Sequence, residues 1–314
     1  MKVSLIVSIY NGADILHVTL PPLFNQTYSS DKYEVILVND ASTDDSKRLI
    51  EEYRNRPQCR IIHHNKNKGR CITRNSGIIS ATGDILIFLD CDIEVNENFI
   101  EHHLKFHEKS SVMGVVSNLQ PGTQKIKNKY HKYLFYSKRG AKTTDQNKAI
   151  PFKYFVLTCT SVKSEAVKKT GLFPTDLPGY GIDLEYAYRL SLNFKSGFYF
   201  APDIRVAIHK LKTLEEAISN FREYGENNLP IILDRYSELA PYCGADYVTS
   251  QGAPTLKTIA GSLLANKFTL WKAKWLLPLI PFPLSNKVIR FILAASTITG
   301  YRNTIKRRGG ISEV

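Results

Sequence analysis

The pair of carboxylates in Asp90-Cys91-Asp92 is the feature of this sequence with the clearest chemical use. It follows an apolar run at residues 85–89, which is typical of a strand buried on both faces of a parallel sheet. Carboxylates at the end of such a strand lie at the carboxyl edge of the sheet, where open α/β sheets bind their ligands. They can hold a hard divalent cation there, and the cation can hold a diphosphate. The alternative is a solvated turn or a helix cap.

The surrounding sequence predicts the elements that would position this pair. The predicted strands are residues 3–9, 33–38, 60–63 and 85–89, with helices at 14–24, 42–54 and 71–80. Such alternation implies right-handed crossovers and a doubly wound, mostly parallel sheet. The loops that follow the first, second and fourth strands should therefore converge on one edge. Neither a GxGxxG nor a GxxxxGK[ST] motif is present, which excludes a P-loop and does not favour an ordinary dinucleotide fold.

Later segments have weaker patterns. Residues 120–150 are polar and are expected to form a mobile loop region over the site, and residues 152–158 alternate as a strand does. A helix is expected from Asp183 to about Leu192, with strands at 197–200 and 204–208 after it. The histidines at 63, 64, 102, 103, 107 and 131 are expected at the surface.

Composition limits the class of protein. The 314 residues are 43% hydrophobic and 23% charged, which is ordinary for a globular chain of one large domain with or without an appendage. Five scattered cysteines without a CxxC pair indicate a reducing compartment, and because a strand pattern begins at Val3 we expect no signal peptide. The net charge of +13 suits nucleic acid, a polyanionic substrate or an anionic membrane. No nucleic-acid-binding motif accompanies it, so we expect no nucleic-acid partner.

Five motifs together resemble the family 2 inverting glycosyltransferases with the GT-A fold. They are VSIYN at 7–11, EVILVNDASTD at 34–44, NKG at 67–69 with RNSG at 74–77, LDCD at 89–92, and GYGIDLE at 179–185 with YRL at 188–190. They stand in the family's order and span roughly residues 3 to 225. The resemblance implies a Rossmann-like, mostly parallel central sheet flanked by helices. We expect this catalytic domain at residues 1–212 and a helical extension at 213–314.

The resemblance also implies a donor site for a nucleoside-diphosphate sugar, a UDP-sugar in preference to a GDP-sugar. Asp40 would contact the base, since a carboxylate at a strand end can accept hydrogen bonds from a base edge or a ribose hydroxyl. Ser8 and Tyr10 lie on the neighbouring loop, where the tyrosine ring could lie along the nucleoside. The alternatives are that Asp40 caps the helix beginning near Ser42 and that Tyr10 only packs.

Charged residues would hold the diphosphate. Lys68 and Arg74 supply positive charge for strong charge-assisted hydrogen bonds, unless they are simply solvated. By resemblance Asp90 would reach the ribose or a metal-bound water, and Asp92 the metal. His209 ends a strand and in some GT-A enzymes a histidine here completes the metal site, although a lone histidine is more often structural. An imidazole ligand favours Mn²⁺ over Mg²⁺, and either divalent cation is a candidate cofactor.

Inverting transfer needs a base that deprotonates the acceptor hydroxyl, and Asp183 is the candidate. It follows Gly179-Tyr180-Gly181 and begins a predicted helix. The family usually has Glu-Asp here, whereas this chain has Ile182 before Asp183, which puts the acceptor contact or the tuning of the base in doubt. An N-cap role is the alternative for Asp183. Glu185 and Arg189 stand four apart on one helix face and would form a pair.

The last hundred residues differ in composition. Residues 268–284 are apolar and aromatic with lysines at their edges, and 288–300 form a second apolar stretch that a basic cluster follows. Neither has the ~20 uninterrupted apolar residues of a spanning helix. They fit an interfacial anchor on an anionic membrane, or else a helical pair packed on the catalytic domain or on a second copy.

The sequence therefore predicts an inverting, metal-dependent sugar transferase at the cytoplasmic face of the membrane. It would build an extracellular or envelope glycan, on a glycan or lipid-linked acceptor. Two alternatives remain open. One is a nucleotidyltransferase, which would need a Gly-rich basic N-terminal signature that residues 9–12 lack. The other is a catalytically silent nucleotide-binding or assembly protein, which only the missing glutamate supports.

Overall fold

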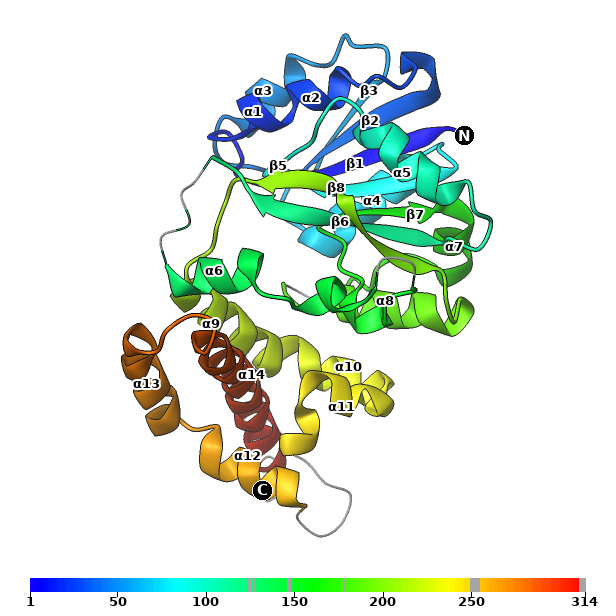
Figure 1. Cartoon of the computed structure of the whole chain (residues 1–314). Helices are drawn as coiled ribbons and strands as arrows, with labels where there is room; N and C mark the ends of the chain where they lie inside the picture. The colour runs from blue at the N-terminus through cyan, green and yellow to red at the C-terminus, as the bar shows by residue number, and fades with distance from the viewer. Residues whose placement is uncertain (124–125, 127, 146–147, 178, 249–254, 311–314) are drawn as a thin grey trace. The chain divides into compact units, whose positions relative to one another are not determined.

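The computed structural model describes the chain except for residues 124–125, 127, 146–147, 178, 249–254 and 311–314 (Figure 1). It divides into two compact units. The first contains residues 1–125, 138–175 and 183–210, and the second contains residues 126–137, 176–182 and 211–314.

The first unit is built on an eight-stranded sheet of order β3-β2-β1-β4-β7-β6-β8-β5. The strands are β1 Val3–Ile9, β2 Tyr33–Asn39, β3 Cys59–His63, β4 Ile85–Asp90, β5 Ile93–Glu94, β6 Gly114–Pro121, β7 Cys159–Lys163 and β8 Phe198–Ile208. The pairs that β1 makes with β2 and β4, and β2 with β3, are parallel, whereas β7 runs antiparallel to β4 and β6. The mostly parallel mixed sheet confirms the predicted fold class.

Helices connect and cover these strands. They are α1 Leu16–Thr19, α2 Pro21–Phe24, α3 Ser46–Glu51, α4 Arg70–Ser80, α5 Phe99–His107, α7 Ser164–Thr170 and α8 Ile182–Asn193. Every residue of β2 is buried, as expected of a strand covered on both faces. Helix α4 approaches β1 so closely that a Cβ on Gly77 would lie 2.2 Å from Ile6 Cγ2, so the glycine at this position brings helix and strand together.

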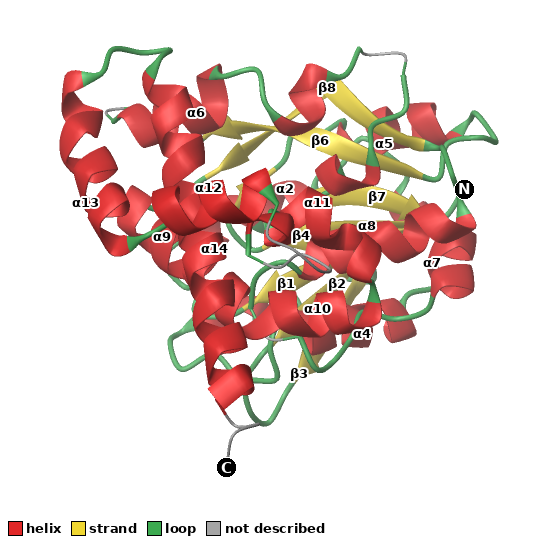
Figure 2. Ribbon diagram, turned by 90° about the horizontal axis from the view of Figure 1, so that it is seen from below, coloured by secondary structure: helices red, strands yellow, loops and turns green. Residues whose placement is uncertain are grey.

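The second unit is helical in the part that the structure describes. It contains α6 Lys129–Tyr136, α9 Leu214–Glu223, a π-helical turn at Tyr224–Asn228, α10 Leu229–Arg235, α11 Ala240–Cys243, α12 Leu256–Leu264, α13 Lys267–Leu276 and α14 Ser285–Gly310. A reciprocal capping box of Thr213 and Glu216 starts α9. Helix α14 runs through the middle of this unit, with α13 on one side and α10 on the other (Figure 2). Its core includes Ile289 and Ile292, which are fully buried.

Several predictions from the sequence are wrong. Residues 152–154 form a 3₁₀ turn, and the strand is at Cys159–Lys163 instead. The two strands expected at 197–208 are one strand, β8. The region expected to be a mobile loop contains α6, which buries Tyr130 and Tyr133. Tyrosines spaced for one helix face were the missed signal, because lysines and asparagines hide the pattern.

Three of the histidines expected at the surface are buried: His64 is 9%, His103 0% and His107 3% exposed. Serine hydroxyls make this burial possible for the last two. Ser161 Oγ lies 2.8 Å from both His103 Nδ1 and His107 Nε2. No helix among the described residues is both long enough and apolar enough to pass through a membrane.

Candidate active site

The strand register brings the predicted donor residues to one edge of the sheet. Ser8 in β1 is paired with Val38 of β2 on one side and with Asp90 of β4 on the other. Asp40 follows β2 immediately and Tyr10 follows β1 immediately. Tyr10 is 49% exposed, so its ring is available at this edge rather than packed in the core.

Hydrogen bonds between the loops after β1 and β2 fix the conformation of both loops. Asn11 and Ala41 both have positive φ, +50° and +55°, which is uncommon for residues with a Cβ. Asn11 Oδ1 accepts a hydrogen bond from Thr43 N at 2.9 Å, and Gly12 N donates to Ser46 Oγ at 2.8 Å. Strained backbone that is fixed by neighbouring contacts is often found at ligand sites.

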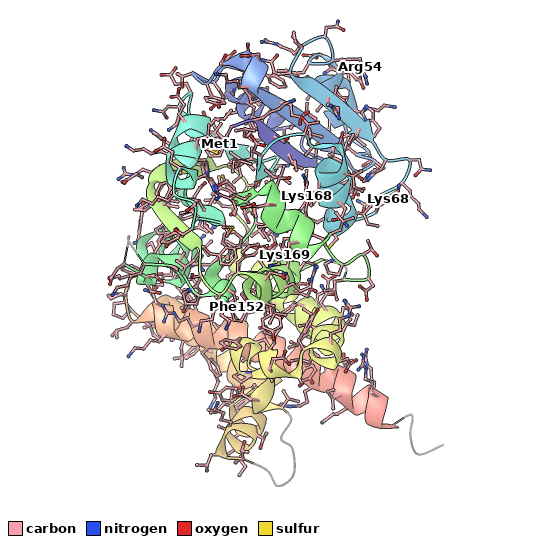
Figure 3. The ribbon with its side chains drawn as sticks, turned by 90° about the vertical axis from the view of Figure 1, so that its right-hand side faces the viewer. Met1, Arg54, Lys68, Phe152, Lys168 and Lys169 are labelled. Atoms are coloured by element: carbon pink, nitrogen blue, oxygen red, sulfur yellow. The ribbon has the colours of Figure 1, made fainter. Side chains whose placement is uncertain are left out.

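Asp40 organises the loop before α4. Its carboxylate is 4% exposed and accepts hydrogen bonds from Lys68 N and Gly69 N, each at 2.9 Å. It also lies 2.7 Å from His64 Nδ1. These bonds run to the loop at 64–69 and not to the first turn of α3. They place Lys68 with its main chain fixed and its side chain exposed, as Figure 3 shows.

Arg74 joins the two carboxylates to which the sequence gives different roles. Its guanidinium donates to Asp183 Oδ1 at 2.9 Å and lies 3.5 Å from Asp90 Oδ1. It also donates to Leu157 O at 3.0 Å, and it is only 1% exposed. The prediction of a solvated or diphosphate-facing Arg74 missed these contacts, because sequence spacing does not show that α8 returns to α4. Arg74 therefore orients Asp90 and Asp183 relative to each other.

Arg70 is a cation of this edge that the sequence reasoning passed over. It is exposed at the start of α4, one turn before Arg74. The charge of Asp90, and then those of Asp183 and Asp92, raise the pKa of Arg70. An exposed guanidinium that faces three carboxylates is well placed for an incoming diphosphate. The signal was the run Lys68-Gly69-Arg70 just before a helix.

Asp92 has the electrostatics of a cation ligand. Burial, and then the charge of Asp90, raise the pKa of Asp92 to about 6. Two carboxylates that repel each other in a partly buried site are relieved when a cation binds, so these residues fit a divalent metal. Among the described residues no group of three or more His, Cys, Asp or Glu side chains is arranged to hold a metal.

His209 lies next to Asp92 through its main chain. His209 N donates to Asp92 O at 3.0 Å, which extends the pairing of β5 with β8. Its ring is 7% exposed, and Nε2 lies 2.7 Å from Glu94 Oε2. The structure thus gives the ring a carboxylate partner, Glu94, that the sequence reasoning did not name.

Asp183 lies in the first turn of α8 and is 24% exposed. Its carboxylate binds Arg74, as described above. Two residues later Glu185 is 2% exposed and accepts from Arg189 Nε at 2.7 Å, which confirms the predicted pair. The pair anchors α8, since Arg189 also donates to Thr170 O and Leu172 O.

The model of glycosyl transferase family 2 matches residues 4–171, more than half of the chain. The chain belongs to glycosyl transferase family 2. This match contains β2 to β7, all of β1 except Val3, and the carboxylates Asp40, Asp90 and Asp92. Asp183, Glu185 and His209 lie beyond it.

Relatives found by sequence are glycosyltransferases. The chain is 25% identical over 240 residues to the glycosyltransferase AglE of Haloferax volcanii, covering 75% of this chain and 76% of AglE. It is 37% identical over 101 residues to the uncharacterized glycosyltransferase YibD of Escherichia coli, covering 32% of this chain and 28% of YibD. Matches above 30% identity span between 15% and 37% of the relatives' length.

Solved structures with the same fold cover nearly the whole chain. Staphylococcus aureus TarS, residues 1–349 in complex with UDP, has a TM-score of 0.59 and 18% identity, covering 99% of this chain and 92% of that 1–349 chain. The mannosyltransferase PcManGT of Pyrobaculum calidifontis, in complex with GDP-Man and Mn²⁺, has a TM-score of 0.59 and 16% identity, covering 98% and 88%. At these identities the likeness concerns the fold, which is the GT-A fold predicted from the motifs.

Proposed function

We propose that this family 2 chain moves a sugar from a nucleoside-diphosphate sugar to an acceptor hydroxyl, with inversion at the anomeric carbon. The observation that carries the proposal is the bridge that Arg74 makes between Asp90 and Asp183. It ties a carboxylate of the donor edge to a carboxylate that can serve as a base. A single displacement needs both within one site, since the attack and the departure happen together.

Asp183 is the proposed base. Arg74 occupies its Oδ1, and Oδ2 is left to take the proton of the acceptor hydroxyl as that oxygen attacks. Arg74 is buried and held by Leu157 O as well, so it fixes the direction of the carboxylate. Ile182, which stands where the family usually has a glutamate, is 2% exposed and packs in the core. We therefore assign the orientation of the base to Arg74 and not to the residue at position 182.

The donor would lie along the sheet edge. Tyr10 and Ser8 would face the nucleoside, with Asp40 contacting the base or shaping the 64–69 loop that borders it. Arg70 and Lys68 would hold diphosphate oxygens, and Asp90 would reach the ribose or a water of the metal. The TarS and PcManGT structures hold UDP and GDP-Man, which supports a nucleoside diphosphate. We place a UDP-sugar ahead of a GDP-sugar.

A divalent cation fits beside these groups. Asp92 would hold it together with oxygens of the donor, and His209 would stand at the same strand end, its ring turned to Glu94. Bound there, Mn²⁺ or Mg²⁺ would supply positive charge for the departing diphosphate. PcManGT, whose structure contains Mn²⁺, supports the choice of a divalent metal.

The charge of the chain supports a proposal for the acceptor and for the place of the reaction. A net charge of +13 and the apolar, basic end of the sequence suit a lipid-linked or polyanionic acceptor at the cytoplasmic face of the membrane. The proposed product is an extracellular or envelope glycan.

The decisive experiment measures release of free nucleoside diphosphate from a panel of nucleotide sugars, with and without Mn²⁺ or Mg²⁺. Asp183→Asn should lower kcat by at least about a hundredfold and leave the KM for the donor nearly unchanged, because the amide cannot take the proton. The matched control is Asp203→Asn, an exposed aspartate on β8. Unchanged turnover in Asp183→Asn would rule out the base assignment.

The two alternative functions give other results. A nucleotidyltransferase would release pyrophosphate from a nucleoside triphosphate and a sugar phosphate. A silent nucleotide-binding protein would be protected by nucleotide against thermal unfolding but would turn over no donor.

A further inference from the structure

The outer face of α13 carries a row of aromatic side chains that the proposed transfer reaction does not use. Phe268 and Trp271 are each 60% exposed and Trp275 is 63% exposed. Their spacing of three and four residues puts them on one side of the helix. Leu279, 70% exposed, continues the row into the 3₁₀ turn Leu277–Leu279. We call these four side chains the aromatic row.

The row is distinct from the face by which α13 joins the helical unit. Leu270, Ala273 and Leu277 belong to the cluster that packs on Ile289 and Ile292 of α14. Positions 270, 273 and 277 lie opposite 268, 271 and 275 on a helix of 3.6 residues per turn. Helix α13 is therefore apolar on both sides, and its own core accounts for only one of them.

The chain has two tryptophans, and both are in this row. Tryptophan has a large apolar body and one N–H donor, and it favours the boundary between lipid and water. A solvent-exposed pair one turn apart is costly in a protein that remains in water. The rings of Phe268 and Trp271 stack at 6.2 Å, which makes the apolar surface continuous.

Positive charge surrounds the row. Residues 255–310 contain ten lysines and arginines and no acidic residue, so they carry +10 of the net +13 of the chain. Lys267, Lys272 and Lys274 belong to α13 itself. Lys272 Nζ lies 4.4 Å from the centre of the Phe268 ring, so a cation stands directly beside the apolar surface. Aromatic side chains with adjacent lysines are the pattern of helices that lie in the interface of an anionic bilayer.

This charge also bears on what covers the row. A second copy docked through this face would bring Lys267 and Lys272 against the same lysines of the first copy, and like charges oppose such association. Anionic headgroups are attracted by the same charges. The one occupant that satisfies both the aromatic rings and the lysines is an anionic lipid surface.

We propose that the aromatic row of α13 docks the chain on an anionic membrane. The rings of Phe268, Trp271 and Trp275 enter the headgroup region, and Lys267 and Lys272 pair with lipid phosphates. The proposal deepens the proposed function by naming its membrane contact, and it rests on that function only for the lipid-linked acceptor.

Co-sedimentation of the full chain with vesicles tests it. Phosphatidylcholine vesicles that contain phosphatidylglycerol should bind the chain, and pure phosphatidylcholine vesicles should bind it much less. Phe268→Ser with Trp275→Ser should weaken partitioning at least about tenfold. The control pair, Ile79→Ser with Leu192→Ser, removes side chains that are 73% and 59% exposed in the first unit and should leave binding unchanged.

A second measurement uses Trp271 as the remaining probe. In the variant with only Trp275→Ser, the fluorescence of Trp271 should shift to the blue on vesicle binding, because the ring leaves water. Lys267→Gln with Lys272→Gln should weaken binding about tenfold or more and reduce its dependence on salt, since each lysine near an anionic surface is worth roughly fivefold. The matched exposed pair Lys32→Gln with Lys47→Gln should change it less.

Failure of this proposal is separable from failure of the proposed function, because vesicle binding needs no donor and donor turnover needs no vesicle. The proposal is overturned if the native chain does not bind anionic vesicles, or if the aromatic double variant binds as the native chain does. It is also overturned if the chain is a dimer in light scattering that the aromatic substitutions dissociate.

Discussion

The carboxyl edge of the sheet and the outer face of α13 both depart from the usual rule that charged side chains are exposed and apolar side chains are buried. At the sheet edge, charged groups are withdrawn from water: Arg74 is 1% exposed beside two carboxylates. On α13, apolar groups are left in water: both tryptophans are at least 60% exposed. Neither arrangement favours the free protein. A bound ligand can compensate for such burial or exposure, so departures of this kind mark binding sites. We propose that the ligand is a nucleotide sugar at the sheet edge and lipid at α13.

The two sites depend on different kinds of interaction. The edge depends on specific pairs, so a single side chain should matter greatly. The α13 face depends on summed area and charge, so its substitutions should be graded.

Removal of Arg74 should have the largest effect. Arg74→Ala leaves Asp90 and Asp183 facing each other without a cation, and breaking a buried pair of this kind costs about 3–5 kcal/mol of stability. We expect that loss in urea unfolding, together with a fall in kcat of more than about a hundredfold. Arg74→Lys should restore much of the stability but less of the activity, because an ammonium cannot contact both carboxylates and Leu157 O in the same geometry.

The matched control is Arg48→Ala, which removes an exposed helix-surface pair with Glu52. It should cost well under about 1 kcal/mol. Equal effects of Arg74→Ala and Arg48→Ala would contradict the idea that the edge depends on specific pairs.

Removal of the cation should come next. Chelation should lower turnover by about a hundredfold, and added Mn²⁺ or Mg²⁺ should restore it. In the native chain, UDP should protect against thermal unfolding only when the metal is present. In Asp92→Asn, the protection by UDP should no longer depend on the metal. If Asp92→Asn kept a full metal response, the cation would lie elsewhere.

The buried histidines provide a pH test of the same unit away from the edge. Burial lowers the pKa of His107 to about 4, compared with an ordinary value of 6.5. Between these values the unfolded chain binds more protons than the folded chain, so stability falls as pH is lowered from 6.5 towards 4. The full loss is about 3 kcal/mol by this linkage. His103 is buried in the same cluster, and burial places its pKa well below the ordinary value too.

Urea titrations at pH 7, 5.5 and 4.5 would measure this loss. His107→Gln should reduce the dependence of the unfolding free energy on pH, whereas His17→Gln, at an exposed position, should leave that dependence unchanged. A profile that is identical in His107→Gln and the native chain would mean that other groups cause the acid sensitivity.

The sequence predicted the two regions unequally, for physical reasons. Strands β1, β2 and β4 were correctly predicted, and the residues predicted to bind the donor do lie at their ends, because buried parallel strands give continuous apolar runs whose carboxyl ends meet at one edge. The contact of Arg74 with Asp183 was not predictable, since it joins residues 109 apart and depends on where α8 returns. Helix α6 was missed because its buried side chains are tyrosines spaced among lysines. The composition of residues 268–284 suggested that the α13 aromatics are exposed. Only the structure showed that the opposite face of α13 packs on α14.

A glycine that precedes the proposed base gives the smallest expected effect and concerns the second unit. Gly181 has φ +87°, and a Cβ there would lie 2.0 Å from Tyr224 Cε2. The π-helical turn that contains Tyr224 also holds this segment through Asn228 Nδ2, which donates to Tyr180 O at 2.5 Å. The chain continues directly from this segment to Asp183, so its conformation sets how α8 begins.

Gly181→Ala should therefore cost about 2 kcal/mol or more and lower kcat about tenfold, with little change in the donor KM. Gly140→Ala is the control, since Gly140 also has positive φ, +54°, but has no atom within 4 Å of its Cβ position. That control should show only the backbone cost, about 1 kcal/mol, and normal kcat. Combining Gly181→Ala with Tyr224→Ala removes the ring that the new methyl would meet. If the double variant recovered none of the lost kcat, the close contact of Gly181 with the π-helical turn would have no part in positioning Asp183.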